Sequence, residues 1–169
     1  MKKNVTLIGM MGCGKTTVAK ELSKILPEYT LIDIDFEIEK STNKKISEIF
    51  LRYGEPRFRE LESNKIKQFT SKKNQVISVG GGAFEDPNNR RMLIENSEVF
   101  FLKASPHTIY DRIKAETHRP ILKKNFSVEK IATILALREK NYQKANHTIE
   151  TDLKTPLEIA KEILGVINA

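Results

Sequence analysis

Hydrophobic positions along this chain follow two alternating periods. Short apolar runs with a period near two, typical of strands, alternate with longer segments whose apolar residues recur every three or four positions, typical of helices. The predicted strands cover about residues 5–8, 29–34, 75–79, 99–102 and 147–150. The predicted helices cover about residues 18–26, 35–53, 54–62, 86–95, 105–117, 127–145 and 155–167. This alternation predicts an α/β fold of three α/β/α layers, with a five-stranded parallel sheet and right-handed crossovers.

The first predicted strand leads into a glycine-rich turn, Gly9-Met-Met-Gly-Cys-Gly-Lys-Thr16. The turn fits the phosphate-loop pattern G-x-x-x-x-G-K-[ST], in which main-chain N–H groups and the start of the next helix bind phosphate oxygens. Lys15 can reach the β- and γ-phosphates, and the Thr16 hydroxyl can bind Mg²⁺. Glycines also make ordinary tight turns, but the strand, loop and helix all agree with nucleotide binding. The loop therefore predicts a nucleotide-binding protein.

Composition narrows the class of partner. The 169 residues suit one compact domain, residues 1–169, that needs no disulfide or structural metal. Lys and Arg number 29 against 22 Asp and Glu, which favours anionic partners such as nucleic acid or phosphorylated and carboxylated small molecules. The basic residues are scattered and form no nucleic-acid-binding block, so solubilising charge is the more common interpretation. No apolar stripe is left over among the predicted helices, so we expect a monomer.

The sequence also bears on the compartment. Cys13 is the single cysteine, so an intramolecular disulfide is impossible and a reducing, cytoplasmic compartment is expected. The apolar run after the first three residues is too short for a signal peptide, and no stretch is long enough to span a membrane.

Two aspartates, Asp33 and Asp35, stand where the second predicted strand opens into a loop. Ligands of open α/β sheets bind at that edge. Asp33 could hold Mg²⁺ directly or through water, and Asp35 could bind a substrate hydroxyl and take its proton. The structural alternative is a strand end followed by an N-cap aspartate. Spacing alone favours neither interpretation.

Other candidate groups are arginines and glycines. Arg59 and Glu62 lie one helical turn apart, either as a fork for a substrate carboxylate or as a surface ion pair, which is the commoner case. Gly80-Gly-Gly82 either presents N–H groups to a ligand or turns the chain. Arg119 stands in a basic, proline-containing loop that could act as a lid over a transferring phosphate, and Arg138 lies in a long helix. Exposed arginines are the more common case for both.

The combination of motifs is more specific than any of them alone. In chain order they are Gly9 to Thr17, Asp33-Ile-Asp35, Phe58-Arg-Glu-Leu-Glu62, Gly80-Gly-Gly82, Arg119-Pro-Ile-Leu122, and Arg138 followed by Tyr142. In order and spacing this set resembles the bacterial shikimate kinases, over nearly the whole chain. The resemblance implies a P-loop kinase fold of the nucleoside-monophosphate-kinase type, with a substrate-binding region at about 35–62 and a mobile lid at about 114–126. The implied reaction is ATP-dependent phosphorylation of the shikimate 3-hydroxyl to 3-phosphoshikimate.

The resemblance also implies residue roles. The ATP phosphates would be held by Gly12, Cys13, Gly14, Lys15, Thr16 and Thr17, with Arg119 from the lid and Arg112 beside the adenine. Mg²⁺ would be held by Thr16, with Asp33 in its outer shell. Asp35 would bind the reactive hydroxyl, and catalysis would rest on Lys15, Asp35 and Arg119. Shikimate would be bound by Asp35, Arg59, Gly80, Gly81, Gly82 and Arg138.

Two features depart from the family pattern. Cys13 replaces a common serine or alanine, and the nearby helix start and Lys15 predict a thiol-sensitive site. Residues 151–155 lack an arginine that some members place near adenine. A gluconate-type or other metabolite kinase is the alternative of the same class, and it should lack the paired Arg59 and Arg138. A basic, nucleotide-dependent nucleic-acid-binding protein is a more distant alternative, suggested only by the net charge.

Overall fold

The computed structural model describes residues 4–115 and 127–169. Five parallel strands form one sheet in the order β2-β3-β1-β4-β5, which confirms the predicted sheet. The strands are β1 (Asn4–Ile8), β2 (Thr30–Asp33), β3 (Gln75–Ser78), β4 (Glu98–Lys103) and β5 (His147–Glu150). The second strand is shorter than expected, because α2 starts directly at Ile34. Asp35 therefore belongs to the first turn of a helix and not to a loop.

Helices connect the strands, and most begin where a polar residue or proline predicts. They are α1 (Lys15–Ile25), α2 (Ile34–Thr42), α3 (Ile46–Thr70), α4 (Pro87–Asn96), α5 (Pro106–Lys114), α6 (Val128–Tyr142) and α7 (Pro156–Asn168), with a 3₁₀ turn η1 (Ala83–Glu85). Asp86 accepts hydrogen bonds from the N–H groups of Asn88 and Asn89, and Thr155 forms a capping box with Glu158. These local signals fix the helix starts.

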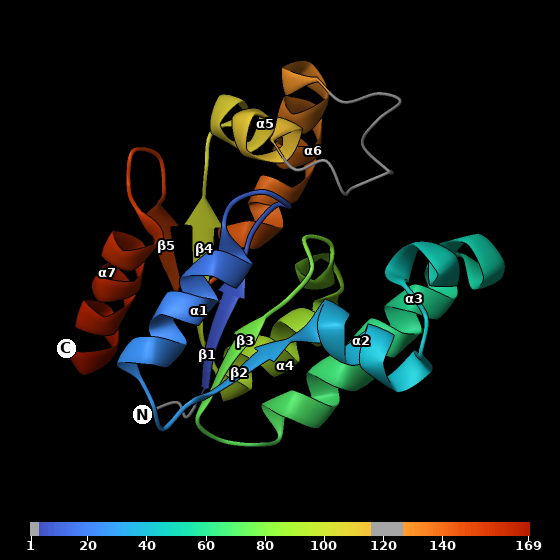
Figure 1. The fold of residues 1–169 in the computed structure, drawn as a ribbon, viewed down its shortest axis with the longest axis horizontal. Coiled ribbons are helices and arrows are strands. Elements are labelled where there is room, and N and C mark those ends of the chain that lie inside the picture. Colours follow the sequence, from blue (N-terminus) through green and yellow to red (C-terminus); the bar gives the residue numbers. More distant parts are fainter. Residues whose placement is uncertain (1–3, 116–126) are drawn as a thin grey trace.

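Helices cover both faces of the sheet. Because alternate strand residues point to opposite sides, neighbouring residues of one strand belong to different buried clusters. Leu7 and Phe100 belong to a buried cluster with α1, α5 and α7, whereas Ile8 and Phe101 belong to a second cluster with α2, α3 and α4. Tyr142 at the end of α6 joins the second cluster. Figure 1 shows α5 and α6 beyond the carboxyl ends of the strands, and α2 with α3 extending to one side. The three-layer α/β/α prediction is confirmed.

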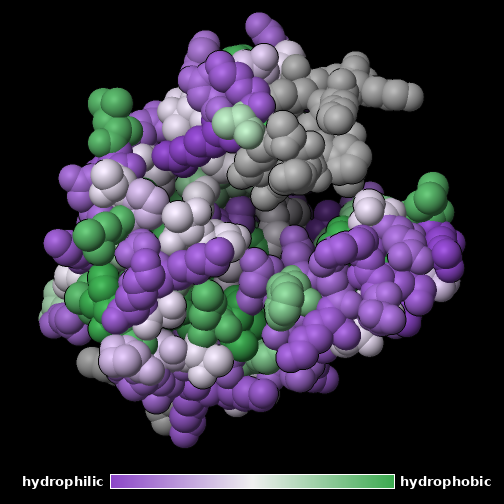
Figure 2. Space-filling view, viewed as in Figure 1, coloured by the Kyte–Doolittle hydropathy of each residue, from purple (hydrophilic) through white to green (hydrophobic). Residues whose placement is uncertain are grey.

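Three details differ from or refine the expectations. Gly54 has φ of 78° and ψ of 171°, so α3 consists of two helical segments that meet there, where the predicted helices over residues 35–53 and 54–62 also meet. In the first turn of α7, which the pattern predicts as a helix, Leu157 is 42% exposed and Ile159 is buried. The α2–α3 side is mostly hydrophilic in Figure 2. Within residues 4–115 and 127–169, no helix has both the length and the apolar character needed to cross a membrane.

Candidate active site

A cavity of about 690 Å³ lies at the carboxyl ends of the strands, the edge at which open α/β sheets bind ligands. Its walls come from the phosphate loop, the ends of β2 and β3, and helices α1, α2, α3, α5, α6 and α7. The lining residues include Met11, Gly12, Cys13, Gly14, Lys15, Thr16, Thr17, Asp33, Asp35, Phe58, Arg59, Glu62, Gly80, Gly81, Gly82, Arg112, Arg138, Lys154, Pro156 and Ile159. The structure thus brings together in one cavity every predicted site residue that it describes.

The phosphate loop has the conformation that its glycines allow. Gly14, the N-cap of α1, has φ of 98°, which disfavours any residue with a Cβ atom. Because glycine has no side chain to cap the helix, the first-turn N–H groups and the positive helix end fit phosphate oxygens. Lys15 Nζ donates to the carbonyl oxygens of Gly9 at 2.7 Å and Met10 at 3.1 Å. A phosphate group would compete with these carbonyls for the ammonium.

Cys13 does not have the exposure expected of a reactive thiol. Its side chain is buried, with only 1% of the residue exposed, and its Sγ lies 3.7 Å from Lys15 Nζ. Reactive cysteines sit in partly exposed surroundings, and a buried thiol is protected from alkylating reagents. The expectation of a thiol-sensitive site is corrected by this burial.

The predicted metal ligands are hydrogen-bonded to each other. Thr16 Oγ1 donates to Asp33 Oδ2 at 3.3 Å, while Asp33 Oδ1 accepts from the Phe36 N–H at 3.1 Å and caps α2. Asp33 therefore has the structural N-cap role that its spacing left open, and its second carboxylate oxygen faces the Thr16 hydroxyl. A hydroxyl beside a carboxylate suits Mg²⁺, which prefers oxygen ligands and keeps several waters. The described parts of the chain contain no cluster of three or more His, Cys, Asp or Glu side chains that could hold a metal, so the protein would supply few ligands.

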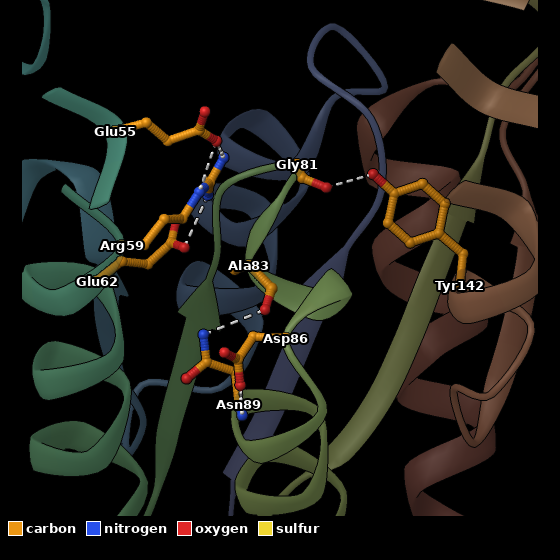
Figure 3. Close-up of polar contacts among 8 residues, drawn as sticks. All are labelled: Glu55, Arg59, Glu62, Gly81, Ala83, Asp86, Asn89 and Tyr142. Atoms are coloured by element: carbon orange, nitrogen blue, oxygen red, sulfur yellow. Dashed lines mark hydrogen bonds and ion pairs between the residues drawn. The ribbon is translucent and has the colours of Figure 1, made fainter. Parts of the chain in front are cut away.

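Glu62 is a buried carboxylate with a strongly raised pKa. Its side chain is fully buried, and burial raises its pKa from 4.5 to about 7, with a smaller contribution from Asp35. Arg59 and Arg138 oppose this rise. Arg59 Nη1 donates to Glu62 Oε1 at 2.8 Å, while its Nε and Nη2 reach the exposed Glu55 at 3.3 Å (Figure 3). The surface-pair interpretation is therefore wrong for Arg59 and Glu62.

The glycines after β3 allow charged side chains to approach closely. A Cβ atom added to Gly82 would lie 2.5 Å from Arg59 Nη2, and one added to Gly81 would lie 3.1 Å from Arg138 Nη1. The triple glycine thus lets two guanidiniums approach the main chain closely. Arg138 is half-buried and lines the cavity, so it does not have the solvent-exposed place usual for a helical arginine.

The remaining predicted residues divide into two groups. Asp35 and Arg112 both line the cavity. Arg112 Nη1 donates to the Cys13 carbonyl at 3.0 Å, so α5 contacts the phosphate loop directly. Arg119 lies outside the described residues. So does the predicted lid, except at its start, because Lys114 is the last residue of α5 and Ala115 its C-cap.

Sequence reasoning missed a group of lining residues at the far side of the phosphate loop. Lys154, Pro156 and Ile159 line the cavity there. The sequence pattern of residues 151–155 indicated only that an arginine found in some family members is missing. Lys154 Nζ pairs with Glu162 at 2.6 Å. The available signal was positional, because the chain that follows β5 must emerge at the same edge as the phosphate loop in a parallel sheet.

The fold and the cavity define a class: a P-loop kinase with room for a small polar acceptor beside its phosphate loop. A family model for shikimate kinase matches residues 11–168. Shikimate kinases of Thermodesulfovibrio yellowstonii and Persephonella marina are 43% and 42% identical, covering 96% and 98% of this chain and 93% and 99% of theirs. A solved structure, shikimate kinase from Acinetobacter baumannii in complex with shikimate, aligns with a TM-score of 0.92 at 34% identity, covering 99% of this chain and 94% of that one.

The chain belongs to the shikimate kinase family. It is an ATP-dependent kinase whose reaction, with Mg²⁺, phosphorylates shikimate in the biosynthesis of aromatic amino acids. The full-length matches leave no large part of the chain outside this family.

Proposed function

We propose that this cavity binds shikimate next to the phosphate loop and directs phosphoryl transfer to its 3-hydroxyl group, giving 3-phosphoshikimate and ADP. The observation that carries the proposal is the gathering of Asp35, Arg59 and Arg138 in one cavity with the phosphate loop. Shikimate carries one carboxylate and several hydroxyls. Two arginines suit the carboxylate and one aspartate suits the alcohol. Gly80, Gly81 and Gly82 would bring main-chain groups close to the same substrate.

The catalytic roles follow from the charges that develop during transfer. Asp35 accepts a hydrogen bond from the reacting hydroxyl and takes its proton as that oxygen attacks. Lys15 leaves the carbonyls of Gly9 and Met10 and places its ammonium on the phosphates, where it offsets the developing negative charge. Arg119 would act from the lid in the same way. A magnesium ion beside Thr16 and Asp33 would supply further charge neutralisation.

Nucleotide binding rests on the phosphate loop and the two helices that flank it. The residues proposed to hold the ATP phosphates are Gly12, Cys13, Gly14, Lys15, Thr16 and Thr17. Arg112 is proposed to flank the adenine. Its place in the cavity lining and its hydrogen bond to the Cys13 carbonyl support this role. Lys154 and Pro156 line the same end of the cavity and are further candidates for base contacts.

We also propose that residues 1–169 act as one domain and as a monomer in the cytoplasm, with the substrate-binding region at about 35–62 and no nucleic acid or membrane partner. All described helices pack around one sheet, which supports a single domain. The lone, buried cysteine supports a reducing compartment. Light scattering coupled to gel filtration would test the monomer, and salt-dependent DNA binding would contradict the absence of a nucleic-acid partner.

The direct test is ADP release with Mg-ATP and shikimate, compared with gluconate and nucleoside monophosphates as acceptors. We expect turnover with shikimate only, and a loss of at least about a hundredfold in kcat for Asp35→Asn, which keeps the shape but not the proton acceptor. Turnover with another alcohol and none with shikimate would contradict the proposed substrate. Full activity of Asp35→Asn would contradict the proposed role of Asp35.

A further inference from the structure

Tyr142, the last residue of α6, stands one helical turn after Arg138 and has no role in the reaction described so far. Its side chain is fully buried, and its ring packs on Phe101 with ring centroids 4.9 Å apart. The Tyr142 hydroxyl donates a hydrogen bond to the carbonyl oxygen of Gly81. Figure 3 shows Tyr142 reaching Gly81 from the side opposite to Arg59 and Glu62. The buried Tyr142 thus supports the main chain of the loop after β3.

The guanidinium of Arg138 lies near the same hydroxyl. Burial raises the pKa of Tyr142 to about 12, and the positive charge and hydrogen bond of Arg138 oppose that rise. The phenol therefore stays protonated near neutral pH and has one proton to donate. Gly81 receives that proton.

These two partners lie against each other in the cavity. A Cβ atom placed on Gly81 would be 3.1 Å from Arg138 Nη1 and 3.3 Å from the Met11 nitrogen. The loop after β3 and the guanidinium from α6 therefore share one contact surface, and the Tyr142 hydroxyl is bonded to the loop side of it. A long arginine side chain has many rotamers, and a fixed partner reduces the entropy it loses when a ligand binds.

We propose that Tyr142 is a positioning residue, whose hydroxyl holds the Gly81 main chain and the Arg138 guanidinium in the arrangement that receives the substrate carboxylate. The inference rests on the proposed function, in which Gly81 and Arg138 bind shikimate. Tyr142 itself does not touch the substrate. It acts before shikimate arrives, by keeping the carboxylate site assembled.

The test is Tyr142→Phe, which removes one oxygen atom and leaves the ring on Phe101. We expect the KM for shikimate to rise about three- to tenfold, the range that follows from losing one or two ordinary hydrogen bonds. The KM for ATP and the kcat should stay within about twofold, because uniform binding of one substrate is lost and the transfer step is not. Tyr29→Phe removes the same oxygen from a half-buried tyrosine packed on the other core cluster and should leave both KM values unchanged.

A shikimate KM within twofold of the wild type would overturn the proposal, and so would an equal rise of the two KM values. Phe101→Leu provides an independent test, because it loosens the packing around Tyr142 and keeps the hydroxyl. It should lower the urea midpoint with little change in the shikimate KM. If it raised that KM as much as Tyr142→Phe does, packing and not the hydroxyl would be responsible, and the proposal would fail.

A double-mutant cycle tests whether Tyr142 acts through Arg138. In the background of Arg138→Lys, which cannot make the same planar fork, Tyr142→Phe should change the shikimate KM by a clearly smaller factor than in the wild type. If Tyr142→Phe changed the shikimate KM by the same factor in both backgrounds, the proposal that Tyr142 acts through Arg138 would be overturned. These outcomes remain distinct from a failure of the proposed function, in which the wild type itself would show no shikimate-dependent ADP release.

Discussion

The buried carboxylate of Glu62 should make the stability of this protein fall as the pH rises from about 4.5 to 7. An unfolded chain releases this proton near its ordinary pKa of 4.5, whereas burial raises the pKa of the folded state to about 7. Between these values the folded state binds more protons than the unfolded state, so each step up in pH favours unfolding. At about 1.4 kcal/mol per pH unit, the full effect of this one group is roughly 3 kcal/mol. The contribution of Glu62 to the free energy of unfolding is complete below pH 4.5 and lost above pH 7.

The assay is urea denaturation of the wild type and Glu62→Gln at intervals from pH 4.5 to 8. Glutamine keeps the shape and one oxygen acceptor for Arg59 but has no charge to bury. The free energy of unfolding of Glu62→Gln, relative to the wild type, should therefore increase by roughly 3 kcal/mol across this range, with equal m-values. Glu55→Gln is the matched control, since Glu55 pairs with the same arginine but is 63% exposed and screened by solvent.

A difference between Glu62→Gln and the wild type that stays constant from pH 4.5 to 8 would refute the reasoning, as would a slope of opposite sign. A second readout concerns binding. Ionised Glu62 holds Arg59 through a charge-assisted hydrogen bond, so the wild-type KM for shikimate should fall as the pH rises through 7. Stability and substrate affinity would then change in opposite directions with pH, which is the usual cost of a buried charge at a functional site.

Two further predictions concern glycines and a helix cap. Gly82→Ala places a Cβ atom 2.5 Å from Arg59 Nη2, so steady-state kinetics should show roughly a tenfold higher shikimate KM with the fold retained, and unchanged kinetics would contradict this. Its control, Gly165→Ala in α7, meets no atom within 4 Å and should raise stability by about 0.5–1 kcal/mol without affecting kinetics. Thr155→Ala removes the capping box with Glu158 and should cost about 1 kcal/mol, or about 2–4 °C in Tm by thermal denaturation; an unchanged Tm would show that the cap contributes little.

The parts of this fold that follow from local chemistry could be predicted from the sequence. Asp86 and Thr155 are examples, because an N-cap depends on a side chain and on N–H groups two or three residues away. The phosphate loop is another, since its glycines and Lys15 act within one short segment. The strand patterns were sufficient for the sheet. The inner strands β1 and β3 are buried at every position, whereas the edge strands β2 and β5 each have one buried position.

The burial of charged groups could not be predicted in the same way. The spacing of Arg59 and Glu62 places them on one face of α3, but whether that face meets solvent depends on the loop after β3, which comes later in the chain. The thiol of Cys13 is a second case in which burial could not be predicted from neighbouring residues. Its neighbours in sequence suggested reactivity, and only the packed structure shows that it is buried.

The three consecutive glycines after β3 connect these observations, because each faces a different charged side chain. A Cβ atom on Gly80 would lie 3.1 Å from Glu62 Oε2, and the corresponding atoms on Gly81 and Gly82 would meet Arg138 and Arg59. Any side chain in this segment would push a carboxylate or a guanidinium away from the cavity. The glycines thus serve less to turn the chain than to let charges from α3 and α6 reach one loop. That requirement comes from two helices on opposite sides of the loop, so it is visible in the sequence only as an unexplained run of glycine.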